Sequence, residues 1–161
     1  MKIDILTLFP EMFGPVTQES ILGRARENGI LDIRLTDIRE YSQDKHKKAD
    51  DYPFGGGAGM VMMADPVFRA LDAIGARGKR IFYMSPRGRI LDQDMIAELA
   101  GTEEFVILCG HYEGVDQRII DCWNMEEVSI GDYILTGGEL PAMILVDAVA
   151  RLVPEVLGSS A

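Results

Sequence analysis

The sequence has only two cysteines and two histidines among its 161 residues, and no long uninterrupted apolar run. Cys109 and Cys122 are too few for a disulfide scaffold, and both have apolar neighbours, so we expect free, buried thiols in a reducing cytoplasm. His46 and His111 do not have the spacing to the cysteines that a zinc site requires. A membrane span needs roughly 20 apolar residues, and no segment approaches that length. The composition therefore argues against a disulfide-rich secreted domain, a zinc protein and a membrane protein.

Basic side chains are also in short supply, because the formal net charge is −10. A surface that grips phosphates is normally basic, so the chain on its own is a poor candidate for a nucleic-acid clamp. The local exceptions are Arg24 with Arg26 and the short cluster at residues 45–48. We interpret both as solvated surface.

Several cofactor and catalytic motifs are missing. Residues 9–14 follow the first predicted strand without the Gly-x-Gly-x-x-Gly fingerprint of dinucleotide-binding folds, and residues 55–59 match it only in part. The chain contains neither the Lys-Ser or Lys-Thr pair of a P-loop nor the Gly-x-Ser-x-Gly elbow of an α/β-hydrolase. These absences weaken the case for a dehydrogenase, an NTPase and a hydrolase.

What the chain does contain is an alternation of strand-like and helix-like segments. The hydrophobic content of 47% suits one globular domain with a substantial core. Asp65 and Pro66 read as a capping acid and a proline at the first helical position, and the segment 41–60 as a long functional loop. The expected fold class is α/β, with a mostly parallel sheet flanked by helices. The predicted strands are 2–8, 31–38, 80–84, 104–109 and 127–130. One helix is predicted to start near residue 11, a second to run from 65 to about 75, and three more to span 92–100, 115–123 and 139–153.

Three loops should meet at one edge of that sheet. Residues 85–88, 110–114 and 131–138 each follow a predicted strand directly. In open parallel sheets, ligands bind outside the carboxyl ends of the strands. Glycines are frequent in these loops and let the backbone approach a ligand or another loop closely. The pattern predicts a nucleotide-type site built largely from main chain.

The same segments resemble the bacterial tRNA (guanine-N1)-methyltransferases, which modify the guanine just 3′ of the anticodon. The resemblance covers essentially the whole chain in the same order of motifs. It is carried by residues 8–13 (Leu-Phe-Pro-Glu-Met-Phe), 50–60 (Asp-Asp-Tyr-Pro-Phe-Gly-Gly-Gly-Ala-Gly-Met), 83–86 (Tyr-Met-Ser-Pro), 108–114 (Leu-Cys-Gly-His-Tyr-Glu-Gly) and 129–141.

The resemblance implies a SPOUT methyltransferase fold, in which the C-terminal part threads through a loop to form a trefoil knot. It also implies that S-adenosylmethionine binds in a bent shape inside the knot, and that a homodimer forms with its sites at the subunit interface. The substrate would be the anticodon loop of a tRNA. A magnesium requirement is carried over with the family, although no dedicated metal cage is visible in the sequence. No membrane partner is expected.

Residue roles follow from the matched motifs. Residues 55–59 resemble the place where the substrate guanine is received, through Gly55, Gly56, Gly57 and Gly59. Taken alone, Tyr83 and Ile130 would read as core residues, and Glu113 and Asp132 as a solvated turn. The residues that the resemblance assigns to the cofactor are Tyr83, Met84, Ser85, Pro86, Gly110, Tyr112, Glu113, Ile130, Gly131, Asp132, Tyr133, Ile134, Leu135, Gly137, Gly138 and Pro141.

The chemistry requires a base and a cation. Guanine N1 carries a proton at neutral pH, so a carboxylate must remove it while a cation near O6 stabilises the developing negative charge. Arg151 matches the family arginine with the second role and also counts as substrate-binding. Asp147 and Arg151 are spaced i, i+4, so an ordinary helix ion pair is the alternative. The helix that carries them is apolar on most sides, which suits burial at a dimer interface.

The family continues beyond residue 161 through a linker into a C-terminal tRNA-binding domain, and the aspartate assigned as general base lies in that linker. We therefore expect these 161 residues to form the S-adenosylmethionine-binding domain, able to bind cofactor and dimerise but impaired in catalysis. Glu113 is the reserve candidate for the base. Two other classes stay open, an NAD-dependent oxidoreductase domain and a non-catalytic RNA-binding module.

Overall fold

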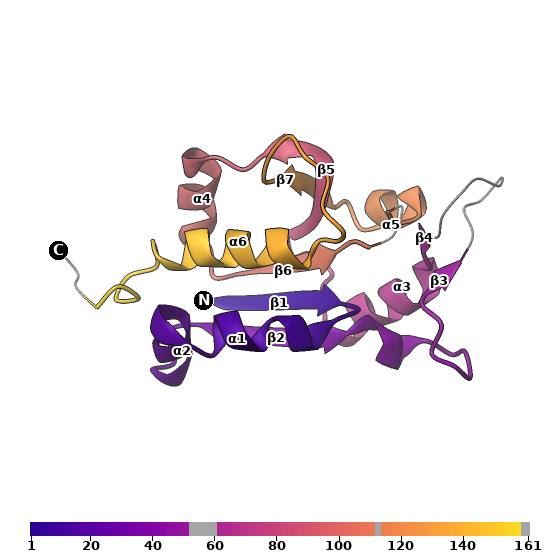
Figure 1. Ribbon diagram of the computed structural model, residues 1–161, viewed down its shortest axis with the longest axis horizontal. Coiled ribbons are helices and arrows are strands. Elements are labelled where there is room, and N and C mark those ends of the chain that lie inside the picture. The colour runs from indigo at the N-terminus through magenta and orange to yellow at the C-terminus, as the bar shows by residue number, and fades with distance from the viewer. Residues whose placement is uncertain (52–60, 112–113, 159–161) are drawn as a thin grey trace.

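The computed structural model describes residues 1–51, 61–111 and 114–158. Its centre is a five-stranded sheet in the order β2-β1-β6-β5-β7, in which every neighbouring pair is parallel (Figure 1). This confirms the predicted α/β class with a mostly parallel sheet. The strands are β1 (Lys2–Thr7), β2 (Asp32–Asp37), β5 (Ile81–Ile90), β6 (Glu104–Cys109) and β7 (Glu126–Ser129). Two short antiparallel strands, β3 (Asp50–Asp51) and β4 (Val61–Met62), pair apart from the main sheet.

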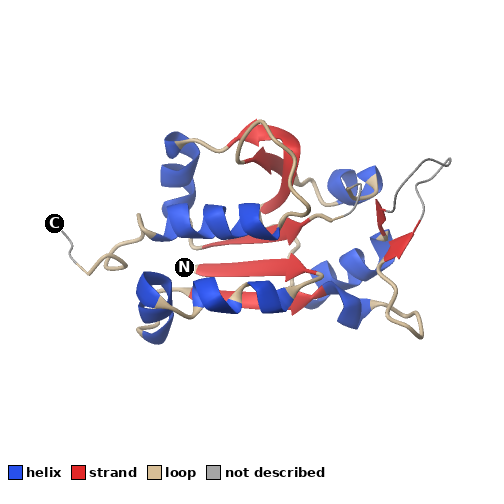
Figure 2. Cartoon of the chain, in the orientation of Figure 1, coloured by secondary structure: helices blue, strands red, loops and turns tan. Residues whose placement is uncertain are grey.

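Helices cover both faces of the sheet, which makes a three-layer arrangement (Figure 2). One core packs α2, α4 and α6 against the sheet, and the other packs α3 and α5 against its opposite face. The helices are α1 (Gly14–Thr17), α2 (Ser20–Glu27), α3 (Ala64–Ala73), α4 (Gln93–Ala100), α5 (Gln117–Cys122) and α6 (Glu139–Ala150), with 3₁₀ turns η1 (Pro10–Met12) and η2 (Ile38–Tyr41).

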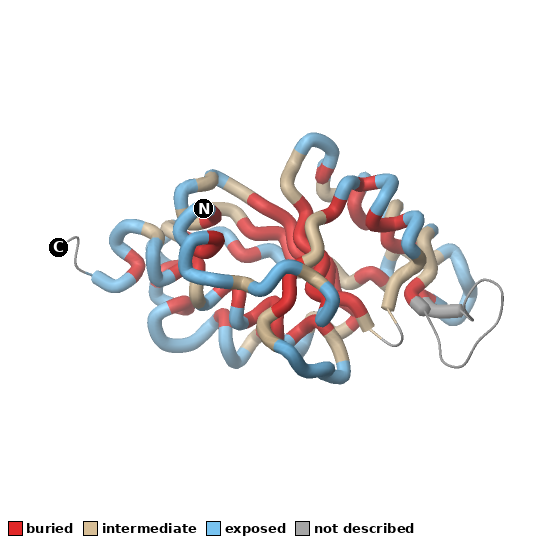
Figure 3. Tube along the Cα trace, turned by 90° about the horizontal axis from the view of Figure 1, so that it is seen from above, coloured by how far each residue is buried: buried red, intermediate tan, exposed pale blue. Residues whose placement is uncertain are grey.

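Strand β6 lies between the two cores. Phe105 and Ile107 point into the first core, whereas Val106 and Leu108 point into the second. A strand covered on both faces reads as a continuous apolar run, and this is what residues 105–109 show. Figure 3 shows the buried segments gathered along the middle of the molecule. Within the part of the chain that the structure describes, no helix is both long and apolar enough to cross a membrane.

Some local predictions were wrong. Asp65 does not cap α3, because Met63 precedes the helix and Asp65 lies inside it, paired with Arg69 at 2.9 Å. The predicted helix near residue 11 is broken into η1, α1 and α2, and Ser20 has a left-handed φ of 54° at the break. Cys122 is exposed, because it ends α5 on the solvent side, whereas Cys109 is buried as predicted. Of the predicted loop 41–60, residues 52–60 lie outside the described part of the chain.

Residues 85–88 are not a loop after a strand, as predicted, but part of β5. The register of β5 against β7 shifts between Met84 and Arg89, since both residues pair with Val128. The intervening residues form a bulge, which bends the strand. At Gly88, an added Cβ would lie 2.4 Å from the backbone of Glu127, so the bulge needs a residue without a side chain there.

Candidate functional site

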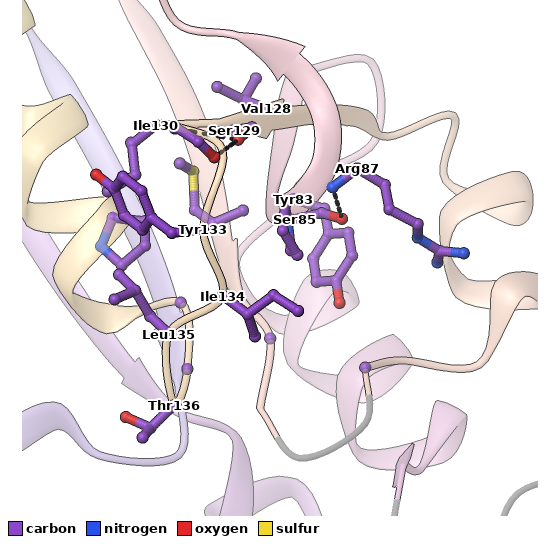
Figure 4. A pocket seen from close by; sticks show the side chains of 18 of the residues that line it. Tyr83, Ser85, Arg87, Val128, Ser129, Ile130, Tyr133, Ile134, Leu135 and Thr136 are labelled. Carbon is purple, nitrogen blue, oxygen red and sulfur yellow. Dashed lines mark hydrogen bonds between the residues drawn. The ribbon is translucent and has the colours of Figure 1, made fainter.

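A pocket of about 380 Å³ lies where β5, β6 and β7 end. Its volume is within the range of small-molecule sites, and its position at the carboxyl ends of parallel strands is where the sheet topology predicts one. Figure 4 shows residues 129–136 running alongside Tyr83 and Ser85, so that the pocket lies between a loop and the bent end of β5.

Thirteen of the sixteen residues predicted to bind the cofactor line this pocket. Asp132 lies in the same loop but is exposed and not part of the lining. Tyr112 and Glu113 lie outside the described residues, as do Gly55, Gly56, Gly57 and Gly59. The thirteen are Tyr83, Met84, Ser85, Pro86, Gly110, Ile130, Gly131, Tyr133, Ile134, Leu135, Gly137, Gly138 and Pro141.

Six further residues line the pocket that the sequence analysis had not assigned to it. Arg87 and Gly114 belong to segments 85–88 and 110–114, which were predicted to lie at this edge of the sheet. Their position in the sequence could therefore have indicated them. His111 was considered only as a metal ligand. The six are Arg87, His111, Gly114, Val128, Ser129 and Thr136.

The back wall of the pocket is a close contact between two backbones. The Gly138 N–H donates a hydrogen bond to the Gly110 carbonyl at 2.7 Å, and Gly137 forms an antiparallel bridge with His111. A Cβ at Gly138 would lie 2.8 Å from the Gly110 nitrogen and 3.0 Å from the Cys109 Cα. Residue 138 must therefore be glycine for the loop to pack against the end of β6.

Two serines hold the backbone on either side of the pocket. The Ser129 hydroxyl donates to the Gly131 carbonyl at 2.8 Å and accepts from the Gly131 N–H at 3.2 Å. The Ser85 hydroxyl accepts from the Arg87 N–H at 3.2 Å, at the start of the bulge (Figure 4). Such local side-chain bonds satisfy backbone groups that the sheet leaves unpaired.

Burial keeps the Tyr83 hydroxyl and the Cys109 thiol neutral. It raises the pKa of Tyr83 to about 12, with a further contribution from the Glu127 carboxylate. The Tyr83 hydroxyl accepts a hydrogen bond from the Val115 N–H and stays protonated at neutral pH. Burial also raises the pKa of the Cys109 thiol, and the neighbouring Glu139 carboxylate adds to this. Neither group is therefore an anionic nucleophile, which favours binding and direct transfer over covalent catalysis by this wall.

The outer wall is apolar and open to solvent. Ile134 is 84% exposed, and Tyr133 and Leu135 are also exposed beside it. Exposed apolar side chains next to a pocket are typical of surfaces that a ligand or a partner covers. Figure 4 shows Ile134 directed toward the space in front of Tyr83.

Arg151 lies far from the pocket of its own chain. It follows the last residue of α6, whereas the pocket touches the beginning of that helix through Gly138 and Pro141. Pro141 is the last lining residue on α6, and Arg151 follows it by ten positions, or roughly 15 Å at 1.5 Å per residue. The alternative interpretation, a helix ion pair, is not seen: the described ion pairs do not include one between Asp147 and Arg151, and only their backbones are hydrogen-bonded, at 3.2 Å.

No metal centre accompanies the pocket in the described ranges, where no group of three or more His, Cys, Asp or Glu side chains could hold an ion. The predicted magnesium requirement thus has no assigned ligands within these ranges.

Comparison with known proteins gives one consistent family. The profile described as tRNA (Guanine-1)-methyltransferase TrmD matches residues 1–161. The tRNA (guanine-N(1)-)-methyltransferase of Ruminiclostridium cellulolyticum is 57% identical, with 99% of this chain and 70% of that protein aligned. The protein of the same name from Syntrophomonas wolfei is 57% identical over 98% of this chain and 64% of its own length. The Geobacillus kaustophilus protein of that name is 54% identical over 100% of this chain and 67% of its own.

A solved structure agrees with the sequence comparisons. The crystal structure of the tRNA (m1G37) methyltransferase from Aquifex aeolicus superimposes with a TM-score of 0.88 at 34% identity, covering 99% of this chain and 72% of that one. The present chain spans 64–70% of the length of the three curated relatives above. Fold, motifs and sequence identity lead to the same conclusion. The chain belongs to the tRNA (guanine-1)-methyltransferase family of enzymes.

Proposed function

We propose that the pocket binds S-adenosylmethionine and that the chain takes part in transferring its methyl group to N1 of the guanine 3′ of a tRNA anticodon. The observation that supports this most is that thirteen residues assigned to the cofactor by the family motifs surround one pocket. They come from three separate chain segments. A random placement of such residues would not collect them at one sheet edge.

The lining fits such a donor in chemical character. Ile130, Leu135 and Tyr133 offer apolar surface suited to an adenine ring, while the glycine-rich loops offer backbone donors and acceptors for polar groups. When bound, the cofactor supplies a sulfonium methyl group that a nucleophile can attack directly. The chain's own contribution would be to hold the donor, orient it and exclude water.

The described lining contains no carboxylate that could serve as the base on the acceptor side. We assign Arg151 to the stabilisation of charge at guanine O6, and Glu113 to the reserve role of base. Because Arg151 lies roughly 15 Å along α6 from the pocket, we infer that the Arg151 of a second copy completes each site in a homodimer. The exposed apolar residues Leu140 and Ile144 on α6 support such a pairing.

Titration with S-adenosylhomocysteine and with NAD tests the ligand class. Calorimetry should show saturable binding of S-adenosylhomocysteine and no binding of NAD, because the chain lacks the dinucleotide fingerprint. At a ligand concentration of 100 times the Kd, the bound form should gain about 2.7 kcal/mol of stability, visible as a rise in Tm. Saturable NAD binding, or no binding of S-adenosylhomocysteine, would contradict the proposal.

We further propose that the 161 residues by themselves transfer methyl groups slowly. The chain spans only 64–70% of the length of these relatives, and the net charge of −10 disfavours tight binding of tRNA. In a methyl-transfer assay on an unmodified tRNA transcript, the chain should show at most about 1% of the rate of a relative of full length, a loss typical of missing acid–base catalysis. A rate close to that of the longer relative would refute this and would favour Glu113 as the base.

Three finer points belong to the same proposal. The crossing of residues 137–138 over the end of β6 supports a trefoil knot, because the Gly138–Gly110 hydrogen bond brings the loop against that strand. Magnesium would act with the substrate, without ligands assigned here. The cytoplasm is the proposed location, since tRNA is found there.

A further inference from the structure

A buried carboxylate lies directly behind the pocket. Glu139, the first residue of α6, is only 2% exposed. Its Oε2 accepts a hydrogen bond from the Thr7 hydroxyl at 2.8 Å, and its Oε1 lies 4.0 Å from the Nε2 of His111. Glu139 is not part of the pocket lining, whereas its neighbours Gly137, Gly138 and His111 are.

This carboxylate joins three segments that are distant in sequence. Thr7 ends β1, and its hydroxyl also accepts the Phe9 N–H at 3.0 Å. Cys109 ends β6 and hydrogen-bonds to Glu139. Gly137 is packed so closely that a Cβ there would lie 2.8 Å from the Glu139 Oε1. The carboxylate thus contacts the ends of β1 and β6 and the crossing loop at once.

Burying a charge is costly even when it is hydrogen-bonded, and an apolar side chain of similar size often serves stability equally well. The N-terminal end of α6 and the Thr7 hydroxyl offset part of the cost. What an apolar residue could not do is hold Thr7 and Cys109 through directed hydrogen bonds while packing against the loop at Gly137. The arrangement therefore indicates that Glu139 serves to position its neighbours rather than to stabilise the fold.

We propose that Glu139 is a positioning residue that fixes Gly137 and Gly138 against the end of β6, and so sets the shape of the pocket before any ligand binds. In this role Glu139 touches neither donor nor acceptor. It acts through the loop, and Thr7 orients its carboxylate. The identity of the ligand rests on the proposed function, but the fixing of the loop does not.

The test compares two buried threonines. Thr7 and Thr17 are both almost fully buried and both donate a side-chain hydrogen bond, Thr7 to Glu139 and Thr17 to the Phe13 carbonyl at 3.0 Å. Thr7→Val should loosen the loop at Gly137 and Gly138. Thr17→Val should destabilise the chain without affecting that loop. Glu139→Gln keeps an acceptor for Thr7 and should have a milder effect than Glu139→Ala.

Two measurements distinguish a positioning role of Glu139 from an effect on global stability. Hydrogen exchange of the Gly138 amide, without ligand, should accelerate about tenfold in Thr7→Val and Glu139→Ala, as expected for loss of one hydrogen bond to a charged group. Exchange at the Ala76 amide, which donates to the Leu71 carbonyl, should not change beyond the effect of global stability. The Kd for S-adenosylhomocysteine should rise by a similar factor in these variants, and not in Thr17→Val.

The outcomes are distinct. Unchanged Gly138 exchange in folded Thr7→Val would overturn the positioning role, as would an equal acceleration in Thr17→Val. If Glu139→Ala does not fold, Thr7→Val and Glu139→Gln decide the question. If the unaltered chain fails to bind S-adenosylhomocysteine, the proposed function fails, while the exchange measurement still decides whether Glu139 fixes the loop.

Discussion

Gly138→Val is expected to remove binding of S-adenosylhomocysteine, with a loss of about 100-fold or more. The new Cβ would lie within 3.0 Å of the Gly110 nitrogen and the Cys109 Cα. These are backbone atoms at the end of the central strand β6, and they cannot move away as a flexible side chain could. The loop must then move away from β6 and break the Gly138–Gly110 hydrogen bond. Calorimetry with the purified variant measures the loss.

The matched control is Gly101→Ala, at the end of α4. An added Cβ there meets only ordinary contacts, the nearest at 3.5 Å from the Glu98 carbonyl, and φ is −86°. This variant should bind as the unaltered chain does. If Gly138→Val is folded, as judged by circular dichroism, and binds with unchanged affinity, the pocket does not depend on the packing of residues 137–138 against β6.

Ile144→Asp is expected to dissociate the proposed homodimer, raising its dissociation constant by about 100-fold. Ile144 and Leu140 lie one turn apart on α6 and are 47% and 52% exposed in the single chain. If a second copy covers them, an aspartate at this point would be buried without a partner, which is strongly unfavourable. Sedimentation velocity over a concentration series measures the shift.

Ile90→Asp serves as the control, because Ile90 is also exposed but lies at the end of β5 rather than on α6. It should leave the sedimentation behaviour unchanged. A monomeric unaltered chain, or a dimer that tolerates Ile144→Asp, would rule out this face as the dimer interface. Since Ile144 is exposed in the monomer, its replacement should cost little folding stability, so loss of the dimer would not be a consequence of unfolding.

Much of the sheet could be predicted because its strands have distinct patterns. The apolar run predicted the bounds that the structure shows for β6, because a strand buried on both faces is a continuous apolar segment. For α4, Asp92 was predicted to begin the helix, and its carboxylate accepts the Met95 N–H at 2.9 Å. The parallel order also placed the three loops at one edge, where the pocket lies.

Other features depend on contacts between distant segments, which a sequence pattern does not contain. The bulge in β5 arises because Gly88 passes over the backbone of Glu127, a residue about forty positions later. The solvent exposure of Cys122 depends on how α5 docks, not on its apolar neighbours. Arg151 was assigned to the chemistry by its motif alone, and its distance from the pocket became apparent only from the direction of α6.

The strand order governs how the chain can assemble during synthesis. Strand β1 finds its neighbour β2 about thirty residues later, but its other neighbour, β6, emerges only with residues 104–109. Strand β5 is made before β6 and cannot join the sheet until β6 has inserted between it and β1. Such long-range parallel pairing slows folding. Strand β6 is therefore the strand that connects β5 to the β2–β1 pair. The ligand-binding end of the molecule can form only after β6 has paired with both.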